Sequence, residues 1–139
     1  MDKKDELILK TFMHNSRTPV THLANKMGIT ETAVRKRIAK LERFGAIKAY
    51  TAIIDPFFMG FSGIALVGVD TNPEKMLSVF EKIKKISRIR YLALTSGDHM
   101  IMFEIWCRNE KILNEELKKI KKLDGVTKVC PAVLMKRIE

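Results

Sequence analysis

The spacing of apolar residues changes at Asp55-Pro56, and this change divides the chain into two parts. Before it, apolar residues recur at i, i+3, i+4 and i+7, which is the period of a helix that buries one face. After it, short β-type apolar runs alternate with helical stripes. A chain of 139 residues is long enough for two small domains. We therefore expect a helical domain over residues 1–55 and an α+β domain over residues 56–139.

Three short helices are predicted in residues 1–55. Their apolar stripes are Ile8, Leu9, Phe12 and Met13; then Val20, Leu23, Ala24 and Met27; then Val34, Ile38 and Leu41. Thr18 and Thr30 are typical N-caps of the second and third helices, with Pro19 at the first position of the second. Gly28 and Gly45 fit the position just after a helix ends.

The second and third helices are separated only by the tight turn Gly28-Ile29-Thr30. Two short helices joined in this way are typical of a helix-turn-helix, because the turn glycine accepts a left-handed backbone. Residues 47–54 follow as a β-type run and predict a wing or a connecting hinge strand. The first domain is thus predicted to be a winged-helix-like helix-turn-helix.

The second domain is predicted to be ferredoxin-like. Its expected elements are a strand at 64–69, a helix starting at Asn72-Pro73, strands at 90–95 and 100–107, a helix capped by Asn109, and a strand at 126–135. The order β-α-β-β-α-β is that of the split βαβ fold. Pro131 fits the last strand, which lies at an edge of that sheet and tolerates a missing N–H group.

The third predicted helix carries a basic outer face. Residues 31–48 contain six Lys or Arg and two Glu, a net charge of +4 within a chain of +10. Such a face is also common on any solvated helix, but the second helix of a helix-turn-helix lies in the major groove of double-stranded DNA. The candidate DNA-binding residues are Thr30, Thr32, Arg35, Lys36, Lys40 and Arg43.

Within that set, different contacts are expected for different side chains. Thr32, Arg35 and Lys36 are expected to meet bases, because Arg and Lys bond guanine O6 and N7 and Thr meets the thymine methyl group. Lys40 and Arg43 are expected to meet phosphates. By its angle on the helix, Arg37 is expected nearer the packed side, in a structural role.

The first 60 residues carry an ordered set of side chains around the tight turn. These are Asp5, Ile8-Leu9, Phe12, Asn15-Ser16-Arg17-Thr18, Leu23-Ala24, Met27-Gly28-Ile29-Thr30, Val34, Arg37-Ile38, Leu41-Glu42, Gly45 to Tyr50, Ile54-Asp55 and Gly60. In this order they resemble the head and hinge of the Lrp/AsnC, or feast/famine, transcription regulators, and the rest of the chain is similar to that family's ligand-sensing domain.

The resemblance implies a sequence-specific DNA-binding transcription regulator. It implies a homodimer formed through the ferredoxin-like domains, often assembled further into tetramers or octamers. Residues 1–55 would then bind DNA, and residues 56–139 would serve dimerisation and effector sensing. Two recognition helices of a dimer would lie in successive major grooves.

The resemblance also implies an effector loop after the second strand of the ferredoxin-like domain, where a glycine is followed three residues later by an aspartate that helps hold an amino-acid effector. The candidate effector-binding residues are Ser96, Gly97, Asp98, His99 and Met100. Gly97 matches, but Met100 stands at the aspartate position, and a thioether does not pair with an ammonium group as a carboxylate does. Three alternatives stay open. Asp98 takes the place of the family's aspartate, the effector belongs to another chemical class, or the segment is only a hairpin turn that binds no ligand.

No catalytic group, metal site or cofactor is predicted. The three histidines form no cluster with other ligands, and Cys107 and Cys130 lack metal-ligand spacing. The charged N-terminus carries no signal-peptide pattern, and the longest uncharged stretch, 56–69, is too short to cross a bilayer. We expect a cytoplasmic protein without membrane contact. Two alternatives stay open: an enzyme similar to siroheme decarboxylases, which share this architecture, and a dimerisation partner that never contacts DNA.

Overall fold

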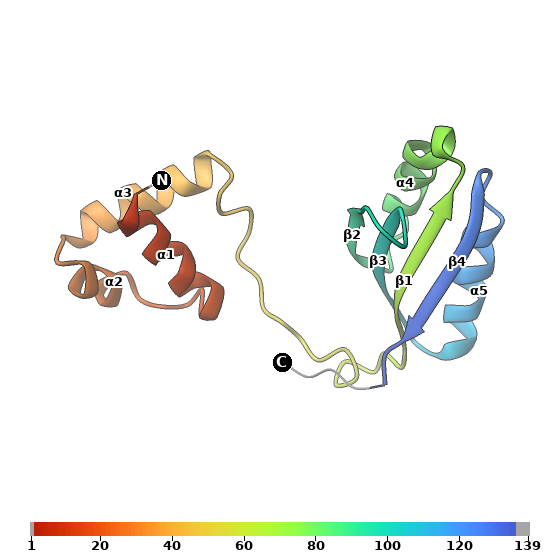
Figure 1. The fold of residues 1–139 in the computed structure, drawn as a ribbon. Helices are drawn as coiled ribbons and strands as arrows, with labels where there is room; N and C mark the ends of the chain where they lie inside the picture. Colours follow the sequence, from red (N-terminus) through yellow and green to blue (C-terminus); the bar gives the residue numbers. More distant parts are fainter. Residues whose placement is uncertain (1, 136–139) are drawn as a thin grey trace. The chain divides into compact units, whose positions relative to one another are not determined.

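The structure is a computed structural model that describes residues 2–135. Its internal contacts divide the chain into two units, Met1–Ile53 and Ile54–Glu139. The first unit is helical and the second is built on a sheet (Figure 1). None of the helices in the described residues is long and apolar enough to cross a bilayer.

The first unit contains α1 (Lys3–His14), α2 (Val20–Met27) and α3 (Glu31–Arg43). The predicted stripes form its core, in which the buried residues are Ile8, Leu23, Ala24, Val34 and Leu41. Met13 is an exception, because its side chain is 86% exposed. The three helices therefore pack as the apolar spacing predicts, except that Met13 is not part of the buried stripe of α1.

The turn between α2 and α3 has the predicted chemistry. Gly28 is left-handed at φ +63°, and the Thr30 hydroxyl accepts a hydrogen bond from the Ala33 N–H at 3.2 Å. The start of α2 differs from the prediction by one residue. Thr18 is not its cap: its hydroxyl donates to the Asn15 carbonyl at 2.7 Å, and Pro19 directly precedes the helix. No side chain caps the start of α2.

The predicted wing or connecting strand at residues 47–54 is not formed. Within residues 2–135 this segment pairs with no strand (Figure 1). A β ladder needs a neighbour that presents free N–H and C=O groups. The helices of the first unit use theirs internally, so the β-type composition of this segment has no strand to pair with.

The second unit has the predicted β-α-β-β-α-β order. Its elements are β1 (Gly63–Thr71), a short 3-10 turn at Pro73–Lys75, α4 (Met76–Lys84), β2 (Ile89–Leu94), β3 (Ile101–Cys107), α5 (Glu110–Lys121) and β4 (Val126–Val133). The antiparallel sheet has the order β2-β3-β1-β4 (Figure 1). Pro131 lies in β4, an edge strand, as predicted. This is the ferredoxin-like fold.

One face of the sheet is buried against α4 and α5. Side chains alternate between the faces of a strand, so Val67, Phe103 and their like-facing neighbours pack against Val79 and Leu113 of the helices. The other face is called the open sheet face below. It carries Leu66, Tyr91, Met102, Glu104, Trp106 and Ala132, which share one side through the registers of the three strand pairs.

Candidate nucleic-acid interface

The outer face of α3 presents its cations to solvent. Thr32, Lys36, Lys40 and Arg43 are all exposed, and they lie opposite the buried residues of the helix. Only one anion, Glu31, precedes them in the first turn of the helix. The arrangement can meet a polyanion along about three helical turns, with one threonine able to contact an apolar group.

Thr30 lies where α3 begins. Its oxygen accepts the Ala33 N–H, so its O–H group is left to donate to another acceptor. Backbone N–H groups of the first helical turn point the same way, which favours an anion such as a phosphate.

Arg35 lies on the flank of α3 and not at the centre of its outer face. Its Nη2 lies 3.7 Å from Glu31 Oε2, and its side chain is 67% exposed. It also lines a hollow with Ser16, Ala39 and Glu42. Surface ion pairs of this kind contribute at most about 1 kcal/mol, so Arg35 can leave Glu31 for a base or a phosphate at little cost.

Arg37 faces inward, as its angle on the helix predicts. Its Nη1 lies 2.6 Å from Asp2 Oδ2 and 2.7 Å from Asp5 Oδ1, and Asp5 is buried. The Asp5 backbone N–H, followed by the Arg37 guanidinium, lowers the pKa of Asp2 below its ordinary value. The contact ties α3 to the first turn of α1 and so fixes the direction of the outer face.

The loop between β2 and β3 is held to β1 by a carboxylate that the sequence did not single out. Asp70 Oδ2 lies 3.2 Å from His99 Nδ1, and its Oδ1 accepts the Met100 N–H at 3.3 Å. The His99 ring lies against Gly68, where a Cβ atom would come within 2.3 Å of it. Gly97 has φ +109°, which only glycine adopts readily.

Two of the five candidate residues in this loop, Met100 and Asp98, differ in exposure. Met100 packs against the core, and its sulfur accepts the Thr71 N–H at 3.5 Å. Asp98 is exposed to solvent. The carboxylate that is accessible on the loop therefore belongs to Asp98, while that of Asp70 is used to hold His99 and Met100.

Other candidate chemistry is sparse in residues 2–135. They contain no group of three or more His, Cys, Asp or Glu side chains placed to hold a metal ion. Both cysteines are free thiols. Burial raises the pKa of the Cys107 thiol, which makes it a poor nucleophile.

Both units match known protein families. Residues 1–42 match the AsnC-type helix-turn-helix domain, and residues 64–139 match the Lrp/AsnC ligand binding domain. A curated relative, the HTH-type transcriptional regulator LrpA of Pyrococcus horikoshii, is 47% identical over 140 residues, which cover 100% of this chain and 99% of the relative. The protein of the same name from Pyrococcus abyssi is 46% identical over the same shares.

Solved structures share the fold at lower identity. The structure of Escherichia coli AsnC has a TM-score of 0.82 at 22% identity. The match covers 99% of this chain and 93% of the AsnC chain. The structure of Bacillus subtilis LrpC has a TM-score of 0.81 at 20% identity. The match covers 100% of this chain and 97% of the LrpC chain.

Proposed function

The chain belongs to the Lrp/AsnC family of DNA-binding transcriptional regulators, and from this premise we propose that it reads DNA with the outer face of α3 as a homodimer. The observation that carries the proposal is that face itself: four exposed side chains, three of them cationic, on the second helix of a capped helix-turn-helix. We further propose a role on cytoplasmic DNA and no catalytic one.

Binding would proceed in two stages. Lys40, Arg43 and the N-terminus of α3 at Thr30 would engage phosphates and position the head, without reading sequence. Thr32, Lys36 and Arg35 would then reach base edges in the major groove. In a dimer the two α3 helices would meet half-sites one turn of DNA, or a multiple of it, apart.

We propose that the open sheet face joins the two copies. Leu66 is 47% exposed and Tyr91 is 62% exposed, beside the half-buried Met102 and Trp106. Apolar side chains gathered on one unpaired sheet face favour burial against another surface. A second copy of the same face fits, because a two-fold interface joins identical patches. Tetramers or octamers would need further surfaces.

The proposed DNA binding predicts both specificity and salt dependence. Fluorescence anisotropy would compare the protein's own upstream region with a scrambled duplex, each at two salt concentrations. We expect affinity for the upstream duplex to be at least about 100-fold tighter and to fall steeply with salt, as counterions are released. Equal weak binding to both duplexes would contradict a specific regulator. A porphyrin absorption band in the purified protein would instead support the enzyme alternative.

We propose that Ser96, Gly97, Asp98, His99 and Met100 form an effector site. In this site the exposed Asp98 carboxylate would pair with the ammonium group of the effector, which the Met100 thioether does not do. A calorimetric screen of the twenty amino acids at millimolar concentration is expected to find one ligand. The Asp98→Asn variant should weaken it at least about 10-fold, because it removes the charge opposite an ammonium group. Glu110→Gln, at the start of α5, should not. No heat from any amino acid would exclude that effector class.

A further inference from the structure

A short exposed tether, residues 51–55, lies between two anchored points of the chain. All five residues are exposed and lie outside helices and strands. Six Cα–Cα steps from Tyr50 to Pro56 span at most about 22 Å, because an extended chain rises by about 3.3–3.6 Å per residue. Whatever holds Tyr50 and Pro56 therefore limits how far apart the two units can move.

Tyr50 is the anchor on the helical unit. Its hydroxyl donates to Glu42 Oε1 of α3 at 2.8 Å, and its ring meets Phe12 of α1 edge-on at 5.8 Å. Burial, followed by the Glu42 carboxylate, raises the pKa of Tyr50 to about 12, so the hydroxyl stays a donor at neutral pH. The chain before the tether is thus held directly on the recognition helix.

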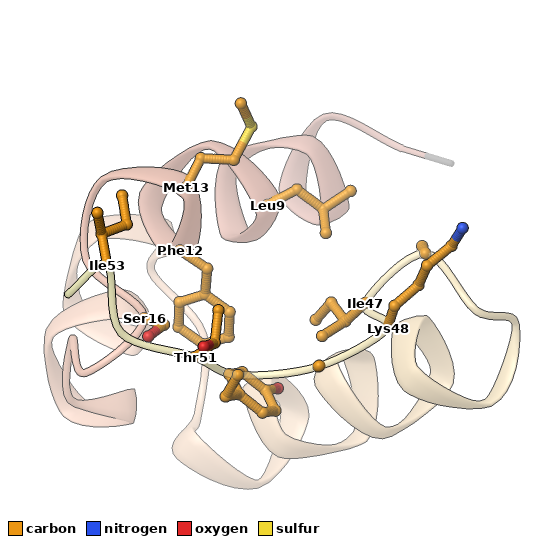
Figure 2. Close-up of a pocket in the computed structure, with 11 residues that line it drawn as sticks. Leu9, Phe12, Met13, Ser16, Ile47, Lys48, Thr51 and Ile53 are labelled. Atoms are coloured by element: carbon orange, nitrogen blue, oxygen red, sulfur yellow. The ribbon is translucent and has the colours of Figure 1, made fainter. Parts of the chain in front are cut away.

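The segment from Ile47 to Ile53 runs along α1 and shares a groove with it, so that Thr51 and Ile53 at the start of the tether also line this groove (Figure 2). Phe12 points toward this segment, and Met13 points away from it (Figure 2). Ile47 packs against the core of the helical unit. The segment is therefore attached by side chains although it forms no strand.

Arg108 is the anchor on the sheet unit. Its Nη1 donates to the Met59 carbonyl at 2.9 Å, and its guanidinium lies 4.4 Å from the centre of the Phe61 ring. Its own carbonyl accepts the Ser62 hydroxyl at 2.9 Å and the Ser62 N–H at 3.3 Å. Because Pro56 is buried and its carbonyl accepts two N–H groups of this turn, residues 56–62 form one fixed turn.

We propose that Tyr50 and Arg108 are positioning residues that set the spacing of the two DNA half-sites by keeping the tether at residues 51–55. The inference rests on the proposed function, since it requires a dimer with two DNA-binding heads. A short tether allows simultaneous binding only over a narrow range of separations, whereas a longer one accepts many. Loss of the Arg108 guanidinium contacts would add up to six residues, 56–61, to the free chain, while Ser62 stays bonded to the backbone carbonyl of residue 108.

The test is a spacing series measured on the full chain. A half-site is first defined by a footprint of the wild-type protein on its own upstream region. A second copy is then moved in steps of one base pair across a full turn of DNA. Wild type is expected to prefer its best spacing by at least about 30-fold over the spacing half a turn away, because the second head then faces the wrong side of the duplex.

Arg108→Ala is expected to reduce this preference to less than about 5-fold, while affinity for a single half-site and the dimer mass stay unchanged. Arg90→Ala is the matched control: Arg90 also stacks on an aromatic ring, that of Trp106 at 5.1 Å, and it reaches the turn only through the contact of Trp106 with Phe61. It should keep the wild-type preference. A Gly-Ser-Gly-Ser insertion between Ala52 and Ile53 should flatten the preference with both anchors intact, even where Arg108→Ala fails to fold.

The outcomes separate the inference from the function. If wild type binds specifically but Arg108→Ala and the insertion keep its spacing preference, the positioning role is wrong and the DNA-binding function stands. If the wild-type protein binds specifically but shows no spacing preference, the positioning role is likewise wrong and the DNA-binding function stands. If wild type binds no duplex specifically, the proposed function and the inference both fail.

Discussion

The Arg35→Ala/Lys36→Ala double variant is expected to bind the specific duplex at least about 100-fold more weakly than wild type, since each good base contact contributes about 1–3 kcal/mol and a dimer loses two sets. Both side chains are exposed on α3, and neither contributes to the core of the helical unit. The variant should therefore keep its melting temperature and its dimer mass. Anisotropy on the specific and scrambled duplexes measures the loss.

The position of the two residues on α3 predicts unequal single effects. Lys36 lies at the centre of the outer face, whereas Arg35 lies on the flank beside Glu31. Lys36→Ala should therefore cost more specificity than Arg35→Ala. Lys118→Ala/Lys121→Ala removes the same charge from exposed positions of α5 and is the control for non-specific attraction. If both double variants weaken binding alike, the outer face of α3 does not read DNA.

An unchanged affinity of the Arg35→Ala/Lys36→Ala variant would have a different meaning. It would favour the alternative in which the chain regulates another family member without contacting DNA itself. That result cannot be confused with misfolding, because the variant side chains lie outside the core. The double variant thus tests the function and the assignment of its site together.

Local signals in the sequence were sufficient for the elements of the fold. The apolar stripes predicted all three helices of the head, and Thr30 and Asn109 cap the helices they were expected to cap. These features depend on residues three or four positions apart, which a periodicity detects. The order β-α-β-β-α-β and the family resemblance were confirmed for the same reason, since each depends on ordered local patterns.

Contacts between distant residues were not predicted. Arg37 was expected on the packed side of α3, but its partners Asp2 and Asp5 lie more than thirty positions earlier. Asp70 holds the β2–β3 loop from another strand, 29 positions before His99. Charged residues give no periodic signal of such pairing, because it depends on how the elements pack.

The segment 47–54 failed as a strand for a related reason. Its composition is β-type, but composition reports only the preference of one chain segment. A strand also needs a second segment that forms hydrogen bonds with it. Tyr50 shows what the segment does instead: it packs by a side chain on α1 and α3. The sequence therefore predicted an extended segment but not what it contacts.

The Leu66→Lys variant is expected to be a monomer that binds the two-half-site duplex at least about 100-fold more weakly, because linkage of two heads raises affinity by about 10²–10⁴. Leu66 lies at the middle of β1 on the open sheet face and is 47% exposed, so lysine fits the isolated unit. Opposite it in register is Glu104. In a dimer joined through this face, two buried ammonium groups would oppose association. Sedimentation gives the mass, and anisotropy gives the affinity.

Leu77→Lys is the matched control for this prediction. Leu77 is 63% exposed on α4, which covers the opposite face of the sheet, so the same change of residue there leaves the open sheet face intact. It should stay dimeric and bind as wild type does. A Leu66→Lys protein that remains a dimer would show that another surface joins the copies. A monomer that keeps its single half-site affinity separates the loss of linkage from damage to α3, since the two lie in different units.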